Sequence, residues 1–266
     1  MLGGMRTEVS IGVPGALGPE AVRVLAPRVE AAGFAGLWLN DSPQGDSLAG
    51  LAAAAEVTTH LRLGTGVIPI DRKPAPALLA ALHRARVPEA RLTLGIGSGQ
   101  LRRGAVEAVS KELLTLRDGT SAAVVVGALG PRMRRLAAEH ADGALLSWLP
   151  PDVAASQAEE LRDAGRRSQG ELPRVALYAR TIVDEGARPM LEREAAQYAS
   201  YPAYAANFAR LGIVAMDSTL PRPGGDLASG VAAYRAVDEL VLRAITPTGS
   251  LEDLLAFVDR AAAQLR

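Results

Sequence analysis

The sequence contains no cysteine, and this single absence removes several kinds of chemistry. Disulfide bonds, thiolate nucleophiles and cysteine-ligated metals are all excluded. Histidine is scarce as well: His60 precedes an expected strand, His83 lies within an expected helix, and His140 ends another. Because none of the three stands at the carboxyl end of a strand, we expect no metal site.

Aromatic residues, lysine and net charge are also in short supply. Aromatics make up 4% of the chain, lysine occurs only at positions 73 and 111, and 29 basic residues balance 29 acidic ones. A neutral chain lacks the basic excess of a nucleic-acid or membrane-surface binder, so we expect neither partner. No apolar run reaches the ~18 residues that a membrane span needs, and Met1–Pro14 shows no signal peptide. These features predict a cytoplasmic protein.

What the chain does contain is an alternation of short β-rich runs and helical stretches. Its 266 residues, 48% of them hydrophobic, suit one domain over residues 1–266. The expected strands are Val9–Val13, Phe34–Leu39, Leu61–Ile68, Arg91–Ile96, Ala122–Val126, Gly143–Trp148, Val175–Val183 and Leu240–Ile245. The helices between and after them are expected over 18–33, 46–59, 74–86, 101–117, 131–140, 151–167 and from Ser250 onwards. This order predicts an α/β protein, a compact (β/α)8 TIM barrel. A doubly wound sheet is the alternative, but no glycine-rich dinucleotide fingerprint follows the first strand.

The connection between the last two strands, Asp184–Asp238, is much longer than the others. It contains two helical stretches, Arg188–Ser200 and Ala203–Leu211, followed by the Pro- and Gly-rich loop Thr219–Gly225. Long loops in compact domains often cover a functional site. We therefore expect a helical insertion between strands seven and eight, with its loop either over the site or merely packed on the surface.

Glycine gathers where the expected strands end, which is the rim where barrels of this class bind ligands. The runs are Gly64-Thr65-Gly66, Gly97-Ser98-Gly99 and Gly127-Ala128-Leu129-Gly130. Bare backbone allows a flat ring or a phosphate to approach closely, although small residues could also simply fit a crowded barrel mouth. After the third run, Pro131 begins a helix whose free N–H groups face the rim, and such a helix start is a site for an anion.

These motifs, in this order, resemble the luciferase-like monooxygenase family. The resemblance covers nearly the whole chain and looks closest to the branch that uses coenzyme F420, a 5-deazaflavin. It rests on Gly33-Phe34-x-x-Leu37-Trp38-Leu39-x-Asp41, Leu61-Arg62-Leu63-Gly64-Thr65-Gly66-Val67, Arg91-Leu92-x-Leu94-Gly95-x-Gly97-Ser98-Gly99, Gly127-Ala128-x-Gly130-Pro131 with the helix that follows, and Tyr198, Tyr201-Pro202-x-Tyr204 and Asn207-Phe208.

The resemblance implies a flavin-type barrel that moves a hydride between a deazaflavin and a small-molecule substrate. It places a cis peptide at Gly66-Val67 under the ring and the cofactor phosphate at Ala128, Gly130 and Pro131. The cofactor-binding residues that we expect are Asp41, Thr65, Gly66, Val67, Gly97, Ser98, Gly99, Ala128, Leu129, Gly130 and Pro131. A homodimer is expected too, from the resemblance and from the small apolar faces at Ala49–Ala55 and Pro76–Leu82.

Two departures from the family pattern bear on the reaction. Ser42 stands where some relatives carry histidine after the second-strand aspartate, and Gln100 and Leu101 stand where they carry glutamate. None of these side chains transfers protons as histidine or glutamate would, so we expect an unsaturated hydride acceptor rather than a sugar phosphate. The catalytic residues stay unassigned. An FMN-dependent luciferase-like monooxygenase and a non-catalytic flavin- or ligand-binding barrel are the alternatives, while an aldolase or isomerase barrel is disfavoured because no lysine ends a strand.

Overall fold

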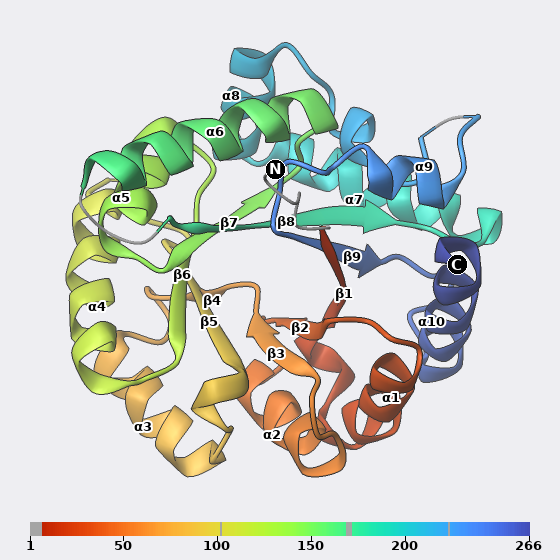
Figure 1. Cartoon of the computed structure of the whole chain (residues 1–266), viewed down its shortest axis with the longest axis horizontal. Coiled ribbons are helices and arrows are strands. Elements are labelled where there is room, and N and C mark those ends of the chain that lie inside the picture. Colours follow the sequence, from red (N-terminus) through yellow and green to blue (C-terminus); the bar gives the residue numbers. More distant parts are fainter. Residues whose placement is uncertain (1–6, 102, 169–171, 223) are drawn as a thin grey trace, which may run out of the picture.

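The computed structural model describes residues 7–101, 103–168, 172–222 and 224–266, and its core is a closed parallel barrel. Figure 1 shows the strands at the centre with helices arranged around them. The strands are β1 Glu8–Pro14, β2 Gly36–Asn40, β3 Arg62–Thr65, β4 Ile68–Pro69, β5 Leu92–Gly97, β6 Ala123–Gly127, β7 Gly143–Ser147, β8 Arg174–Thr181 and β9 Glu239–Ala244. The order β3-β2-β1-β9-β8-β7-β6-β5-β4 closes because β3 also pairs with β5. The predicted (β/α)8 TIM barrel is confirmed.

The third barrel strand departs from its expected form. The sequence predicts one strand over Leu61–Ile68, whereas the structure has β3 and β4 separated by a cis peptide bond between Gly66 and Val67. The predicted cis peptide at this position is therefore confirmed. The two pieces still occupy one barrel position, since both β3 and β4 pair with β5.

The surrounding helices follow the predicted order. They are α1 Pro19–Ala31, α2 Ser47–Val57, α3 Ala75–Ala85, α4 Ala105–Gly119, α5 Pro131–His140, α6 Pro151–Arg167 and α10 Leu251–Leu265. Proline at the first helical position makes the starts of α5 and α6 predictable. The expected start of α4 at Leu101 was wrong, because Gly104 precedes the helix in a left-handed conformation (φ +65°). In the described ranges, no helix is both long and apolar enough to cross a membrane.

The long connection after β8 holds α7 Arg188–Ser200, α8 Pro202–Leu211 and a short helix, α9 Leu227–Ala232, that the sequence analysis did not predict. These helices occupy the sector between α6 and α10 in Figure 1. Of the two positions expected for loop Thr219–Gly225, packing away from the site is favoured, since none of its described residues lines the cavity at the barrel rim. Its Leu220 is fully buried beside β8, receiving a hydrogen bond from the Ile182 N–H (2.9 Å) and donating one to the Arg180 carbonyl (2.8 Å).

The barrel interior changes from polar to apolar along its axis. At the amino-terminal end, buried Glu239 accepts hydrogen bonds from Trp38 Nε1 (2.8 Å) and Arg174 (3.1 Å), and Glu8 pairs with Arg62 (2.6 Å). Above this ionic layer lies a small apolar cluster made by inward-facing side chains of five strands: Trp38, Val125, Leu145, Ala176, Tyr178 and Val241. Strand alternation sends their neighbours, such as Leu177, outward to the helices. The carboxyl ends of the strands are thus left free to form a site.

Candidate functional site

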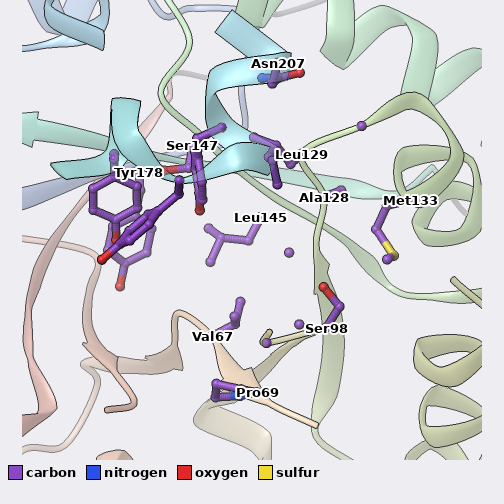
Figure 2. A pocket seen from close by; sticks show the side chains of 18 of the residues that line it. Val67, Pro69, Ser98, Ala128, Leu129, Met133, Leu145, Ser147, Tyr178 and Asn207 are labelled. Carbon is purple, nitrogen blue, oxygen red and sulfur yellow. The ribbon is translucent and has the colours of Figure 1, made fainter. Parts of the chain in front are cut away.

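A cavity of about 690 Å³ opens at the carboxyl ends of the strands and is walled on one side by α7 and α8. Figure 2 shows Val67, Pro69 and Ser98 on one side of it, with Ser147 and Tyr178 on another. Most of the predicted cofactor residues line this cavity: Asp41, Gly66, Val67, Gly97, Ser98, Gly99, Ala128, Leu129 and Gly130. Thr65 and Pro131 do not. The Thr65 hydroxyl instead donates to the Gly95 carbonyl (3.0 Å), and Pro131 is the first residue of α5.

Val67 forms a platform in the mouth of the barrel. Its Cγ2 lies 2.6 Å from the place where a Cβ on Gly97 would be, and its Cγ1 lies 3.0 Å from the equivalent place on Gly127. Real Cβ atoms do not approach as closely as 2.6 Å and rarely approach to 3.0 Å, so glycine makes room for the valine at position 97 and eases its packing at position 127. The bulge is held from the other side by Asn40, whose Nδ2 donates to the Gly66 carbonyl. The result is an apolar side chain held in a fixed position in the lining of the cavity.

The start of α5 presents unpaired backbone donors beside this platform. The first intrahelical bond runs from the Arg134 N–H to the Gly130 carbonyl (3.0 Å), so the N–H groups of Arg132 and Met133 have no intrahelical acceptor. A Cβ on Gly130 would have no atom within 4 Å, and no side chain caps the helix. The Arg132 side chain turns away to pair with Glu107 (3.1 Å). This helix start therefore presents backbone donors without a capping side chain.

Asp41 lines the cavity, but its carboxylate is already engaged. It accepts hydrogen bonds from Ser47 Oγ (2.9 Å) and Arg72 (2.8 Å), with Lys73 Nζ at 3.8 Å, and its side chain is 6% exposed. It joins the segment after β2 to the segment after β4. These contacts hold the Asp41 carboxylate in place at the rim of the cavity.

The inward positions of β8 add two side chains that the sequence analysis did not select. Arg180 is buried: its Nε donates to Glu194 (2.9 Å), its Nη1 donates to Ser147 Oγ (2.6 Å), and its guanidinium stacks on Trp148 (4.1 Å to the ring centroid). Burial alone would raise the pKa of Glu194, but Arg243 and Arg180 outweigh it and hold that pKa below its ordinary value. Tyr178, two residues earlier, crosses the floor of the cavity. Strand alternation alone would have put both side chains inside the barrel.

An aromatic wall faces the cavity, formed by Tyr198 of α7, Tyr201 between the two helices and Tyr204 of α8. The ring centroids of Tyr198 and Tyr204 are 4.9 Å apart in an edge-to-face arrangement. Burial raises the pKa of Tyr204 to about 12, so its phenol is neutral near pH 7. The sequence analysis had these tyrosines only as part of the family resemblance. Among the described residues, no group of three or more histidine, aspartate or glutamate side chains is placed to hold a metal ion.

The cavity combines glycine-rich strand ends, tyrosine rings and a helix start at its rim, and the charged side chains among the described residues that line it are Asp41, Arg180 and Arg210. Its place at the carboxyl ends of the strands is where (β/α)8 barrels bind their ligands. The model of the luciferase-like monooxygenase family matches residues 6–104 and 106–263, and the chain belongs to that family of oxidoreductases.

Solved structures share the fold at low identity. The monooxygenase RslO1 from Streptomyces bottropensis is 17% identical, with 97% of this chain and 98% of that chain covered and a TM-score of 0.71. The coenzyme F420-dependent tetrahydromethanopterin reductase from Methanopyrus kandleri is 15% identical (97% and 99% covered, TM-score 0.73). The oxygenating constituent of 3,6-diketocamphane monooxygenase from Pseudomonas putida, in complex with FMN, is 13% identical (96% and 97% covered, TM-score 0.70).

Proposed function

We propose that this chain is a coenzyme F420-dependent oxidoreductase acting on a small, unsaturated organic substrate. The observation that carries the proposal is the continuous surface from the Val67 platform to the free N–H groups at the start of α5. It offers a flat ring an apolar support and its phosphate a fixed set of donors. The reductase from Methanopyrus kandleri, which has the same fold, uses this cofactor.

The residues present fit such a group. A cavity of about 690 Å³ falls within the range of small-molecule sites. Gly97 and Gly127 leave room for the Val67 platform, and Gly130 leaves the helix start uncovered. Val67 would support the ring, while Ala128, Gly130 and the N–H groups of α5 would hold the phosphate. When bound, a deazaflavin supplies a carbon that exchanges a hydride with the substrate.

The chain itself contributes positioning and exclusion of water rather than strong acid–base chemistry. The one carboxylate known to line the cavity, that of Asp41, is tied to Arg72 and Ser47. The other titratable side chains facing the cavity from the described residues are tyrosines and arginines. Reduction of a polarised carbon–carbon double bond takes up a hydride from the cofactor and then a proton, and this set suits a substrate whose proton comes from solvent or a neutral tyrosine rather than from a carboxylic acid or histidine.

An FMN-dependent monooxygenase is the second candidate, because the Pseudomonas putida protein has the same fold in complex with FMN. Both cofactors carry a flat tricyclic ring and an anionic phosphate, so the features above accept either. Titration of the purified chain with F420 and with FMN, followed by fluorescence, separates them. We expect tighter binding of F420, and reoxidation of bound reduced F420 by enones.

The matched variants are Gly130→Val and Ala263→Val, the second placing the same side chain at an exposed position of α10. Gly130→Val is expected to weaken cofactor binding about 2- to 30-fold, the effect of roughly 0.5–2 kcal/mol at a helix start. Ala263→Val should bind as wild type. If Gly130→Val binds both cofactors normally, the phosphate lies elsewhere. Tight binding without turnover of any acceptor would favour a non-catalytic binding barrel instead.

A further inference from the structure

The Tyr178 ring spans the barrel mouth from β8 to the opposite strands. A Cβ on Gly12 of β1 would lie 2.9 Å from Tyr178 Cε1, and a Cβ on Gly66 would lie 2.5 Å from the Tyr178 hydroxyl oxygen. Glycine at both positions therefore leaves the space that the ring fills. Trp38 packs against it edge to face, with 6.1 Å between centroids, and Tyr178 is only 3% exposed. The phenol is fixed in direction, and its hydroxyl reaches the Gly66-Val67 bulge.

That hydroxyl is buried without a hydrogen-bond partner among the described residues. The Oδ1 atom of Asn40 is in the same condition, although Asn40 Nδ2 donates to the carbonyl of the same Gly66. A donor and an acceptor thus stand unpaired on either side of one glycine, both in the lining of the cavity. Buried polar groups are rarely left this way unless something else satisfies them. Tyr234, a second buried tyrosine, shows the ordinary arrangement: its hydroxyl donates to the Leu149 carbonyl (2.9 Å).

Tyr178 lies away from the proposed phosphate site. In Figure 2 it lies across the cavity from Ala128 and Met133, which flank that site. Arg180, two residues further along β8, stacks on Tyr198 (4.6 Å to the ring centroid), so this strand end adjoins the aromatic wall of Tyr198, Tyr201 and Tyr204. Burial raises the pKa of Tyr178, so the phenol keeps its proton and acts as a donor. A flat apolar molecule with an acceptor oxygen complements this half of the cavity.

We propose that the Tyr178 phenol donates a hydrogen bond to the carbonyl oxygen of the substrate, which is a flat, apolar carbonyl compound seated between the cofactor ring that Val67 supports and the aromatic wall. The proposal rests on the proposed function in assigning the other side of the cavity to the cofactor. Tyr178 is then the residue that selects a carbonyl over a hydrocarbon of the same shape. Asn40 Oδ1 provides an acceptor beside it for a donor on the substrate or for a water.

A pair of probes that differ only in the carbonyl group tests this directly. The dissociation constants of acetophenone and ethylbenzene are measured for wild type, Tyr178→Phe and Tyr234→Phe, with and without F420. The phenylalanine variant keeps the ring, so the barrel stays filled. The ratio of the ethylbenzene constant to the acetophenone constant is expected to fall about three- to tenfold in Tyr178→Phe, as for loss of one neutral hydrogen bond. Tyr234→Phe should leave the ratio unchanged.

Infrared spectra of carbonyl-labelled acetophenone measure the hydrogen bond to the carbonyl group, which would not change if Tyr178 had only a structural role. The bound carbonyl stretch should lie at lower frequency in wild type than in Tyr178→Phe. An equal ratio and an equal stretch in the two proteins, or no binding of acetophenone by wild type, overturns the proposal. Loss of F420 or FMN affinity in Tyr178→Phe would also overturn it, because the hydroxyl would then serve the cofactor. Failure of wild type to bind either cofactor, with the carbonyl ratio still dependent on Tyr178, would overturn the proposed function alone.

Discussion

The Val67 platform makes a sharp prediction for Gly97→Ala. The added methyl would lie 2.6 Å from Val67 Cγ2, well inside ordinary contact distance, so either the valine or β5 must move. Overpacking of this kind lowers the free energy of unfolding by about 1–3 kcal/mol. Alanine also restricts the backbone of the unfolded chain, which raises the free energy of unfolding by about 0.4–1 kcal/mol. We expect a net loss of about 1–2 kcal/mol, which lowers the melting temperature by about 2–8 °C in a chain of this size.

Two further variants establish that the contact with Val67 is the cause. Gly127→Ala brings its methyl only to 3.0 Å from Val67 Cγ1, so its loss should be smaller. Combining Gly97→Ala with Val67→Ala removes the clashing atoms, and the double variant should lose less stability than the two single losses added together. Thermal melts measured by circular dichroism, with F420 titrations on each variant, provide the data. If Gly97→Ala is as stable as wild type and its effect is the same with or without Val67, the platform argument is refuted.

The remaining predictions concern three side chains, Tyr178, Tyr234 and Glu194. Tyr178→Phe should leave the free energy of unfolding unchanged or raise it, because the lost hydroxyl has no partner, whereas Tyr234→Phe should lower it by about 1–2 kcal/mol in chemical denaturation. The pKa of Glu194 is held low by Arg243 and Arg180, so its contribution is present above the ordinary carboxyl pKa and is lost as pH falls through the lowered value. Glu194→Gln should therefore be less stable than wild type at pH 7, with the gap narrowing below about pH 4 in thermal melts.

Much of the fold was predictable because local signals agree with the barrel. Proline at the start of α5 and glycine ahead of it are read directly from the chain, and the strands carry short β-branched runs. The short helix α9 was missed because its six residues, Leu227–Ala232, follow a Pro- and Gly-rich loop and show little periodicity. The cis peptide at Gly66-Val67 was expected only through the family resemblance, since the Gly64-Thr65-Gly66 run marks the region but does not by itself indicate a cis bond.

The parts of the candidate site that consist of backbone could be predicted from the sequence, whereas the parts that consist of long side chains could not. The glycine runs at the ends of β5 and β6 predict a rim of exposed backbone, and in the structure both runs line one cavity. Tyr178 gives no such signal, because its role depends on space left by Gly12 and Gly66, which are distant in sequence. Arg180 was missed for a similar reason: its partner Glu194 belongs to α7, and no spacing rule joins a strand to a later insertion.

The proposed cofactor-binding residues and the tyrosine wall come from separate parts of the chain, and this bears on how such proteins diversify. The parts proposed to hold the cofactor come from strand ends scattered between β3 and α5, whereas the tyrosines of the opposite wall all belong to one continuous stretch, residues 184–238. Both seams of that stretch are pinned to the scaffold, Asp184 by an ion pair to Arg260 and Asp238 by one to Arg162. Recombination at the two ends of this stretch would exchange the whole tyrosine wall between homologues in a single event. The substrate preference would then change while the proposed cofactor-binding residues stayed the same.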